Sequence, residues 1–137
     1  MTLLNLDAGP FRFVGRLEED LAPKTCAWFK AQLPYEQHLI HVRWSGEACW
    51  IPLGDLNPDL SYENHTSYPA PGQMILYPGG ISETEFLLAY GAVHFASKLG
   101  QLAGNHFLTI VEGLENLATL GKSTLWEGAK PIRVSLK

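Results

Sequence analysis

Two proline-glycine turns, a few residues apart, limit how the middle of this chain can fold. Pro71-Gly72 and Pro78-Gly79-Gly80 enclose the short apolar run Gln73–Tyr77. Because proline and glycine interrupt regular elements, this run predicts a short strand between two turns. The longer run Glu83–Tyr90 follows the second turn and predicts another strand. The stretch Tyr62–Gly91, which contains both strands, also holds most of the side chains that are able to do chemistry.

The predicted strand Glu83–Tyr90 divides its side chains between two faces, because successive residues of a strand point in opposite directions. One face carries Thr84, Phe86, Leu88 and Tyr90, and the other carries Glu83, Glu85, Leu87 and Ala89. The first face predicts contact with a core. The second is interpreted either as a solvated outer face or as a pair of carboxylates able to share a proton or bind a metal.

Length and composition favour one compact domain that spans residues 1–137. The sequence is 46% hydrophobic and only 18% charged, which is typical of a globule rather than a disordered chain. A chain of this size buries roughly two-thirds of the surface that its unfolded form exposes. It therefore needs neither a disulfide nor a structural metal to hold a core.

Charge and cysteine use restrict the partners and the compartment. The formal net charge is −4 and the basic residues are scattered, which argues against nucleic acid. No window approaches the run of about 20 apolar residues that a membrane span needs, and residues 1–10 lack the basic start of a signal peptide. Cys26 and Cys49 form no Cys-x-x-Cys motif, so we expect free, buried thiols in a reducing cytoplasm.

The remaining pattern predicts short strands and a few helices. Strands are expected at Phe11–Leu17, Leu39–Trp44, Ala48–Ile51, Phe107–Val111 and Ile132–Leu136, and helices at Leu21–Pro34, Ala92–Ala103 and Glu112–Leu120. Gly15, inside the first strand, predicts a bulge or a close backbone approach. About seven or eight strands with two or three helices predict a mainly β fold, a barrel or sandwich with helical caps.

Three segments, taken together, resemble the cyclophilin family. They are A-P-K-T-C-A-W-F-K at Ala22–Lys30, the Pro-Gly-bounded strand at Pro71–Gly80, and the closing pattern of Phe107–Leu117 followed by Gly128–Leu136. Their order and spacing match that family over roughly Phe11–Leu136. The resemblance implies a closed cyclophilin-like β-barrel of about eight strands, capped by two helices.

The middle of the chain is most similar to a group of small bacterial proteins of cyclophilin-like fold without an established function. The matching residues are Tyr62–Gly72 and Tyr77–Glu85. Prolyl isomerases of this fold use an arginine on the strand after the first helix, whereas Ala48–Ile51 reads A-C-W-I. Arg43, on the preceding arm, matches no family position. The resemblance therefore implies a fold, and prolyl isomerase activity is the least favoured function.

A polar cluster between aromatic residues provides the main functional hypothesis, a small-molecule site in a cleft on the barrel. Tyr68, Tyr77, Tyr90 and Trp50 are further aromatic residues able to line it. The ligand-binding candidates are Arg43, Trp44, Tyr62, Glu63, Asn64, His65, Glu83 and Glu85. Arg43 is expected to hold a ligand carboxylate, because its planar fork matches that group, and Asn64 and His65 to form hydrogen bonds.

The alternative hypothesis is a small hydrolase or isomerase assisted by a metal or by carboxylates. His65, His94 and His106, with Glu63 or Glu85, are able to form a two-histidine, one-carboxylate site. No local spacing supports this, and scattered histidines are more often structural or surface residues. We therefore expect no cofactor. A homo-oligomer is also expected, because a small barrel with few charges has apolar surface available for association.

Overall fold

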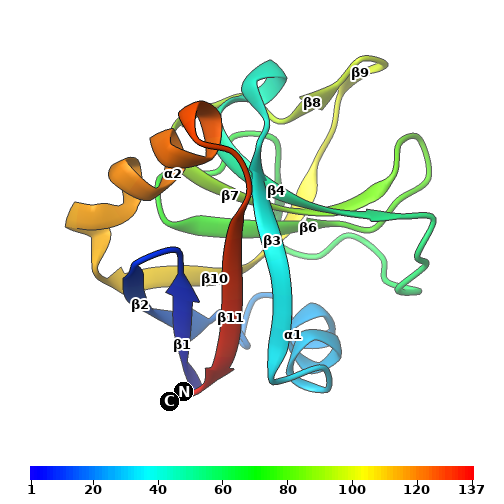
Figure 1. The fold of residues 1–137 in the computed structure, drawn as a ribbon. Coiled ribbons are helices and arrows are strands. Elements are labelled where there is room, and N and C mark those ends of the chain that lie inside the picture. The colour runs from blue at the N-terminus through cyan, green and yellow to red at the C-terminus, as the bar shows by residue number, and fades with distance from the viewer.

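Eight antiparallel strands close into a ring in the computed structural model, which describes residues 1–137 (Figure 1). In ring order they are β2 (Phe11–Leu17), β1 (Leu3–Ala8), β11 (Lys130–Leu136), β3 (Tyr35–His41), β4 (Gly46–Gly54), β7 (Thr84–Val93), β6 (Gln73–Tyr77) and β10 (Gly104–Glu112). β10 pairs with β2 and completes the ring. The predicted closed barrel is confirmed.

Two helices and several short elements complete the chain. They are α1 (Pro23–Lys30), α2 (Leu117–Trp126), the 3-10 turns η1 (Arg43–Ser45) and η2 (Leu114–Asn116), and the short strands β5 (His65–Thr66), β8 (Ala96–Ser97) and β9 (Gly100–Gln101). Figure 1 shows α1 and α2 at opposite ends of the barrel. β5 adds to β10, while β8 and β9 pair with each other as a separate hairpin. No helix of the structure has the length and apolar character required to cross a membrane.

The main core fills the barrel interior and includes the predicted inner face of β7. Phe86 lies 5.5 Å from Phe29 of α1 and 5.6 Å from Phe107 of β10, measured between ring centroids. Each such aromatic pair adds about 0.5–1.5 kcal/mol beyond its buried area. Gly15 makes the predicted close approach, because a Cβ added there would lie 3.0 Å from the Leu6 side chain and 3.1 Å from that of Leu108.

A second, smaller core covers the outer face of β4, β6 and β7. Its buried residues are Val42, Ala48, Ile75, Tyr77, Leu87, Phe95 and Leu102. Phe95 and Leu102 belong to residues 94–102, which lie over this part of the barrel. The interpretation of Glu83–Ala89 as a solvated outer face is therefore wrong, since Leu87 and Ala89 are buried there and Glu85 is only 5% exposed.

The helix predicted at Ala92–Ala103 is wrong, and its backbone hydrogen bonds show why. The His94 N–H donates to the Ser45 carbonyl at 3.0 Å, and the Phe95 N–H donates to the Ser67 carbonyl at 2.7 Å. These long-range bonds replace the helical ones and hold the segment extended. Gly100 then takes a positive φ of 119°, which turns β8 back into β9.

Other boundaries also move. The helical turn predicted at Glu112–Leu120 is α2, which begins at Leu117 and continues through Gly121. The predicted strand Leu39–Trp44 is β3, which begins at Tyr35 and ends before η1. β1 was not predicted, although its inward residues alternate with half-buried ones.

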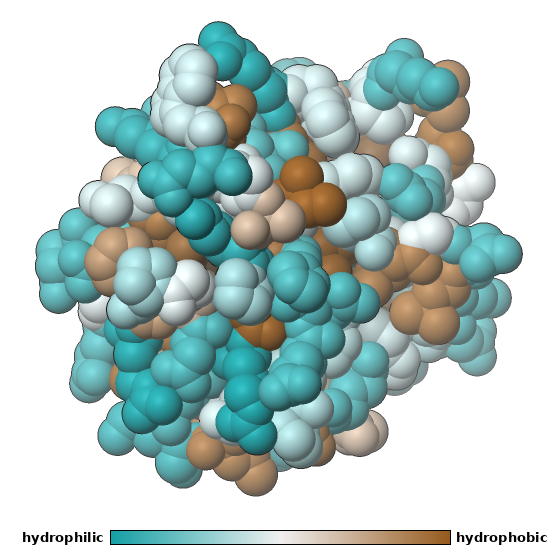
Figure 2. Space-filling model, viewed as in Figure 1, coloured by the Kyte–Doolittle hydropathy of each residue, from teal (hydrophilic) through white to brown (hydrophobic).

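Hydrophilic residues predominate on the face seen in Figure 2, where hydrophobic residues form small separate patches.

Candidate functional site

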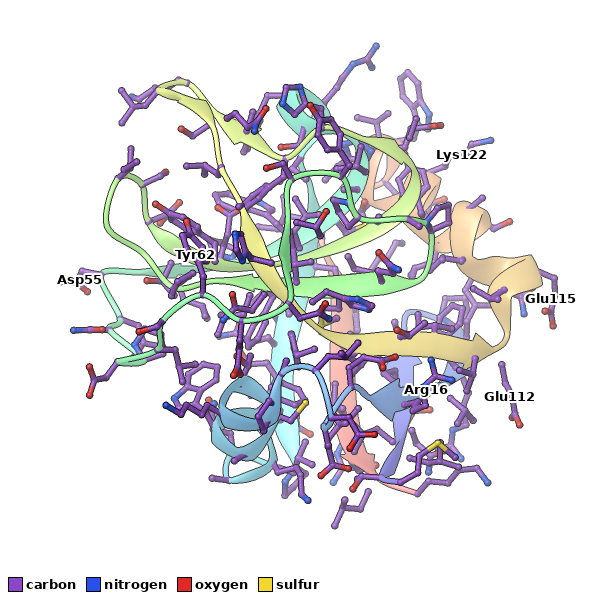
Figure 3. The ribbon with its side chains drawn as sticks, turned by 180° about the vertical axis from the view of Figure 1, so that it is seen from behind. Arg16, Asp55, Tyr62, Glu112, Glu115 and Lys122 are labelled. Atoms are coloured by element: carbon purple, nitrogen blue, oxygen red, sulfur yellow. The ribbon has the colours of Figure 1, made fainter.

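A cleft of about 410 Å³ lies on the outer side of the barrel beside the second core. Its walls come from η1, β4, β7, β8 and the loop before β7. The lining residues are Trp44, Trp50, Ser82, Glu83, Glu85, Ala96, Ser97 and Lys98, and we call it the tryptophan cleft. A hollow of about 720 Å³ adjoins it, with Asp55 on its wall (Figure 3), and shares Ser82 and Glu83, but no aromatic side chain lines that hollow.

Glu85 is the buried acid of the tryptophan cleft. It lies in the middle of three strands, opposite Pro52 of β4 and Tyr77 of β6. Burial, with the charge of Glu83 adding to it, raises the pKa of Glu85 to about 8. A carboxyl group with this pKa is mostly protonated at neutral pH, so it is able to donate a hydrogen bond or to exchange a proton with a ligand.

Two tryptophans form the apolar wall of the cleft. The Trp44 and Trp50 rings pack edge to face, with centroids 5.3 Å apart. Ser45, next to Trp44, fixes the opposite wall: its hydroxyl donates to the Ala96 carbonyl at 3.1 Å and accepts the Ala96 N–H at 3.2 Å. Trp44 remains 59% exposed, which leaves its face open to a ligand.

The loop that carries Ser82 and Glu83 is held by a buried tyrosine. The Tyr77 hydroxyl accepts the N–H groups of Ile81 at 2.9 Å and Ser82 at 3.2 Å. The Tyr77 ring is itself fixed edge to face against Phe95. These bonds therefore hold the loop at the rim of the cleft even when no ligand is bound.

The structure brings Trp44, Glu83 and Glu85 together but places the other predicted residues elsewhere. Glu63 accepts both the N–H and the hydroxyl of Thr25, at 2.6 and 2.8 Å, and so caps the first turn of α1. Asn105 joins this contact, since its side chain donates to the Thr25 hydroxyl at 3.1 Å. These bonds give Glu63 a structural role at the start of the helix.

The neighbouring polar residues have separate surroundings. The Asn64 side chain donates to the His106 carbonyl at 2.9 Å. His65 stacks on Tyr62, with centroids 4.7 Å apart. Figure 3 shows Tyr62 in the left half of that view and Lys122 of α2 at the upper right. The polar cluster therefore lies on the surface over β10 and β5, outside the lining of the tryptophan cleft.

The three histidines considered for a metal have different partners. His94 Nε2 lies 2.8 Å from Gln101 Oε1, and its ring stacks on Tyr68. His106 Nε2 lies 2.8 Å from Thr109 Oγ1, and burial lowers the pKa of His106. The structure brings no three histidine, cysteine or acidic side chains into a group able to hold a metal ion.

Arg43 points to a different cavity from Trp44, its neighbour in η1. It lines a second cleft of about 410 Å³ with His41, Tyr90 and Lys122. In the tryptophan cleft the cation is Lys98 instead, which sequence reasoning missed because residues 92–103 were interpreted as a helix. Only the pairing of residues 94–102 with Ser45 and Ser67 brings Lys98 to this wall, and no local pattern signals that pairing.

Comparison with solved structures supports the fold. McbB in complex with tryptophan aligns with a TM-score of 0.72 at 16% identity, covering 98% of this chain and 44% of McbB. This chain therefore spans less than half the length of McbB. A hypothetical protein from Archaeoglobus fulgidus aligns with a TM-score of 0.65 at 15% identity, covering 99% of this chain and 95% of that protein.

A cyclophilin-type structure is also similar. The peptidyl-prolyl cis-trans isomerase of Cryptosporidium parvum, in the presence of the dipeptide Ala-Pro, aligns with a TM-score of 0.58 at 14% identity and covers 98% of both chains. At these identities the likeness concerns the fold alone. No curated protein matches the sequence. A family model described as "Protein of unknown function (DUF3830)" matches residues 4–136, so this cyclophilin-like chain belongs to the DUF3830 family.

Proposed function

We propose that this protein binds a small organic cation, an amine with an apolar body, in the tryptophan cleft. The observation that carries the proposal is a buried carboxyl group, Glu85, in a cleft whose aromatic wall is Trp44 and Trp50. Tryptophan faces attract cations, by about 0.5–2 kcal/mol, and a carboxylate completes the recognition of an amine. A volume of about 410 Å³ is suited to a small molecule.

Burial of Glu85 couples binding to proton release. In the empty cleft, burial and then the charge of Glu83 disfavour the ionised carboxylate, and Lys98 of the same lining forms no ion pair with it, so the pKa of Glu85 is raised to about 8. An amine that enters stabilises the ionised form, so the pKa of Glu85 falls and its proton leaves. Glu83, exposed at the rim, offsets the positive charge of Lys98 in the same lining, and ionised Glu85 then makes the cleft negative toward an amine.

Indole N–H resonances in nitrogen-15 NMR spectra provide the test. Benzylamine, an aromatic amine, is titrated into the protein, and the Trp44 and Trp50 signals, assigned with single Trp→Phe variants, are followed. We expect both signals to shift saturably and Glu85→Gln to weaken binding about tenfold or more, since the neutral amide removes the ion pair. Glu115→Gln, which neutralises an exposed carboxylate of η2, is the matched control and should bind like wild type.

Calorimetry in two buffers tests the proton step. If Glu85 loses its proton when the amine binds, the binding enthalpy of wild type depends on the ionisation enthalpy of the buffer, whereas that of Glu85→Gln does not. Absence of saturable shifts of Trp44 and Trp50, or equal affinity of wild type and Glu85→Gln, would show that the cleft does not bind cations in this way.

The raised pKa of Glu85 also favours a second function, acid–base catalysis on the bound molecule. A general acid or base works best with a pKa near the working pH, and such a group contributes about 10²–10⁴ in rate. For a hydrolase or isomerase substrate of this cleft, kcat/KM should change with a pKa near 8, and Glu85→Gln should lose about 100-fold or more. Prolyl isomerisation is favoured less, because no arginine lines the cleft.

A further inference from the structure

We propose that a second cleft, between η1 and α2, binds a small organic carboxylate. We call it the α2 cleft, and its volume is about 410 Å³. The residues that the proposal uses are His41, Arg43, Tyr90, Lys122, Leu125 and Trp126. This cleft shares no residue with the tryptophan cleft, so the inference is independent of the function proposed above.

The α2 cleft is locally positive in an acidic protein. Arg43 and Lys122 come from different elements, and neither takes part in any ion pair of the structure. The one acid of the cleft, Glu47, is held by the Ala92 N–H, which donates to its Oε1 at 3.0 Å. The cleft therefore holds two cations and one carboxylate that is already hydrogen-bonded, so it carries a net positive charge within a chain of net charge −4. A singly charged anion would neutralise this positive charge.

A tyrosine hydroxyl provides the hydrogen-bond donor of the cleft. Tyr90 OH lies 2.7 Å from His41 Nε2, and His41 Nδ1 is the buried side-chain atom that has no hydrogen-bond partner. We assign the ring hydrogen to Nε2, because the alternative tautomer buries an unpaired N–H. His41 then donates to the Tyr90 oxygen. Tyr90 keeps its own hydrogen for an acceptor in the cleft, such as a carboxylate oxygen.

The outer wall of the cleft is apolar and formed by the last turn of α2. Trp126 is 78% exposed and Leu125 lies beside it. Next to the Arg43 fork, which matches a carboxylate in shape, an open indole face suits a flat hydrophobic body. Gly121 lets α2 rest directly on the Tyr90 ring, because any Cβ at this position would overlap that ring. The position of the wall is therefore fixed.

Phenylacetate, an aromatic carboxylate, is the probe, and the Trp126 indole N–H resonance is the readout, assigned with Trp126→Phe. We expect a saturable shift of Trp126 with Trp44 and Trp50 unchanged. Arg43→Met and Lys122→Met should each weaken binding about tenfold or more, since each removes one of the two cations. Lys98→Met, which also removes an exposed cation but from the tryptophan cleft, is the control and should bind like wild type.

The same titrations separate this proposal from the previous one. Benzylamine should move Trp44 and Trp50, and phenylacetate should move Trp126. The α2 proposal is overturned if phenylacetate leaves Trp126 in place, if Arg43→Met and Lys122→Met bind it as wild type does, or if benzylamine shifts Trp126 with equal affinity. Both variants replace exposed side chains, and their unchanged remaining indole resonances verify that they are folded.

Discussion

Burial of Glu85 makes the folded protein bind a proton that the unfolded chain releases. Its pKa rises from an ordinary value of 4.5 to about 8, first through burial and then through the charge of Glu83. Between these values the folded state holds the proton and the unfolded state does not. The stability that this bound proton contributes is complete below pH 4.5, the pKa of Glu85 in the unfolded chain. It is lost as the pH rises through about 8, and the free energy of unfolding falls by up to about 1.4 kcal/mol per pH unit on the way.

Glu85→Gln keeps the side-chain shape and removes the titration. Between about pH 6 and pH 8, wild type should lose about 2 kcal/mol of unfolding free energy more than the variant does. Urea unfolding, followed by tryptophan fluorescence at both pH values, measures this difference. Glu115→Gln should keep the wild-type pH dependence. Parallel curves for wild type and Glu85→Gln would mean that Glu85 ionises normally in the folded state.

Gly121 is the second residue whose surroundings predict how a substitution changes stability. In an exposed helix, replacing glycine by alanine stabilises by about 1 kcal/mol. Here the added Cβ overlaps the Tyr90 ring, so we expect Gly121→Ala to destabilise by about 1–3 kcal/mol instead. Thr119→Ala, on the exposed side of α2, should be neutral or slightly stabilising. The denaturant midpoint should fall for Gly121→Ala and should stay the same or rise slightly for Thr119→Ala.

At the scale of elements, the sequence predicted correctly those strands and helices whose ends are marked by nearby residues such as proline and glycine. The strands Gln73–Tyr77 and Phe11–Leu17 match the predicted bounds. The helix predicted at Leu21–Pro34 is the shorter α1, Pro23–Lys30, which begins at a proline, whose fixed φ suits the first helical position. Ala92–Ala103 failed because its helix-like spacing of apolar residues has another origin. Phe95 and Leu102 pack on the barrel, whereas Leu99, which lies between them in the sequence, is 66% exposed.

The candidate site shows the same division between local and long-range information. Alternation along β7 placed Glu85 on the same face as Leu87, which is correct. The burial that raises its pKa comes from residues remote in sequence, so it was not predictable from the strand alone. Arg43 and Trp44 were predicted in one cleft, yet these neighbours in η1 line different cavities.

Helix α1 depends on a contact with a distant loop. Its Ncap residue, Ala22, provides no side-chain cap, and no acidic residue occupies the first turn. Glu63 supplies the missing acceptor for Thr25, which is fully buried. Glu63→Ala leaves two buried donors without a partner, so we expect a loss of about 1–3 kcal/mol, measured by thermal or denaturant unfolding.

The control for this variant is Glu36→Ala. Glu36 pairs with Arg133 at 3.1 Å on the surface, where an ion pair contributes about 0–1 kcal/mol. A similar loss in both variants would contradict a specific capping role for Glu63. Circular dichroism adds a second readout, because fraying of α1 lowers the helical signal while the barrel strands remain paired.

At the scale of the whole molecule, the closed ring encloses a core that shields both thiols. Cys26 and Cys49 are free and each is 1% exposed, as predicted. Cys26 contacts the Phe107 carbonyl, and Cys49 lies 3.3 Å from Thr124 Oγ1. Burial raises the pKa of Cys26 to about 12 and that of Cys49 to about 11, which suppresses the reactive thiolate.

A thiol-reactive dye therefore tests whether the barrel opens as one unit. We expect no thiol to react in the folded protein and both to react once it is unfolded in denaturant. Ser61→Cys, at an exposed loop position, should add one thiol that reacts at once. Rapid labelling of Cys26 or Cys49 under native conditions would reveal local opening of the core.

The homo-oligomer stays a prediction. Large apolar side chains are exposed at Trp126, Leu99 and Ile81, which lie on separate elements or loops. On the face of Figure 2, hydrophobic residues form only small patches. Size-exclusion chromatography with light scattering measures the mass in solution, and a mass near 15.2 kDa would rule out a stable dimer at that concentration.

The place of β11 in the ring has a consequence for synthesis. β11 lies between β1 and β3, so the barrel strand made last separates two of the barrel strands made early. Until residues 130–136 have left the ribosome, β1 and β3 have no common neighbour and the barrel stays open along that seam. The exposed edges of a nascent chain are sites for mispairing. A chaperone that binds the emerging chain would therefore be most needed just before the last strand appears.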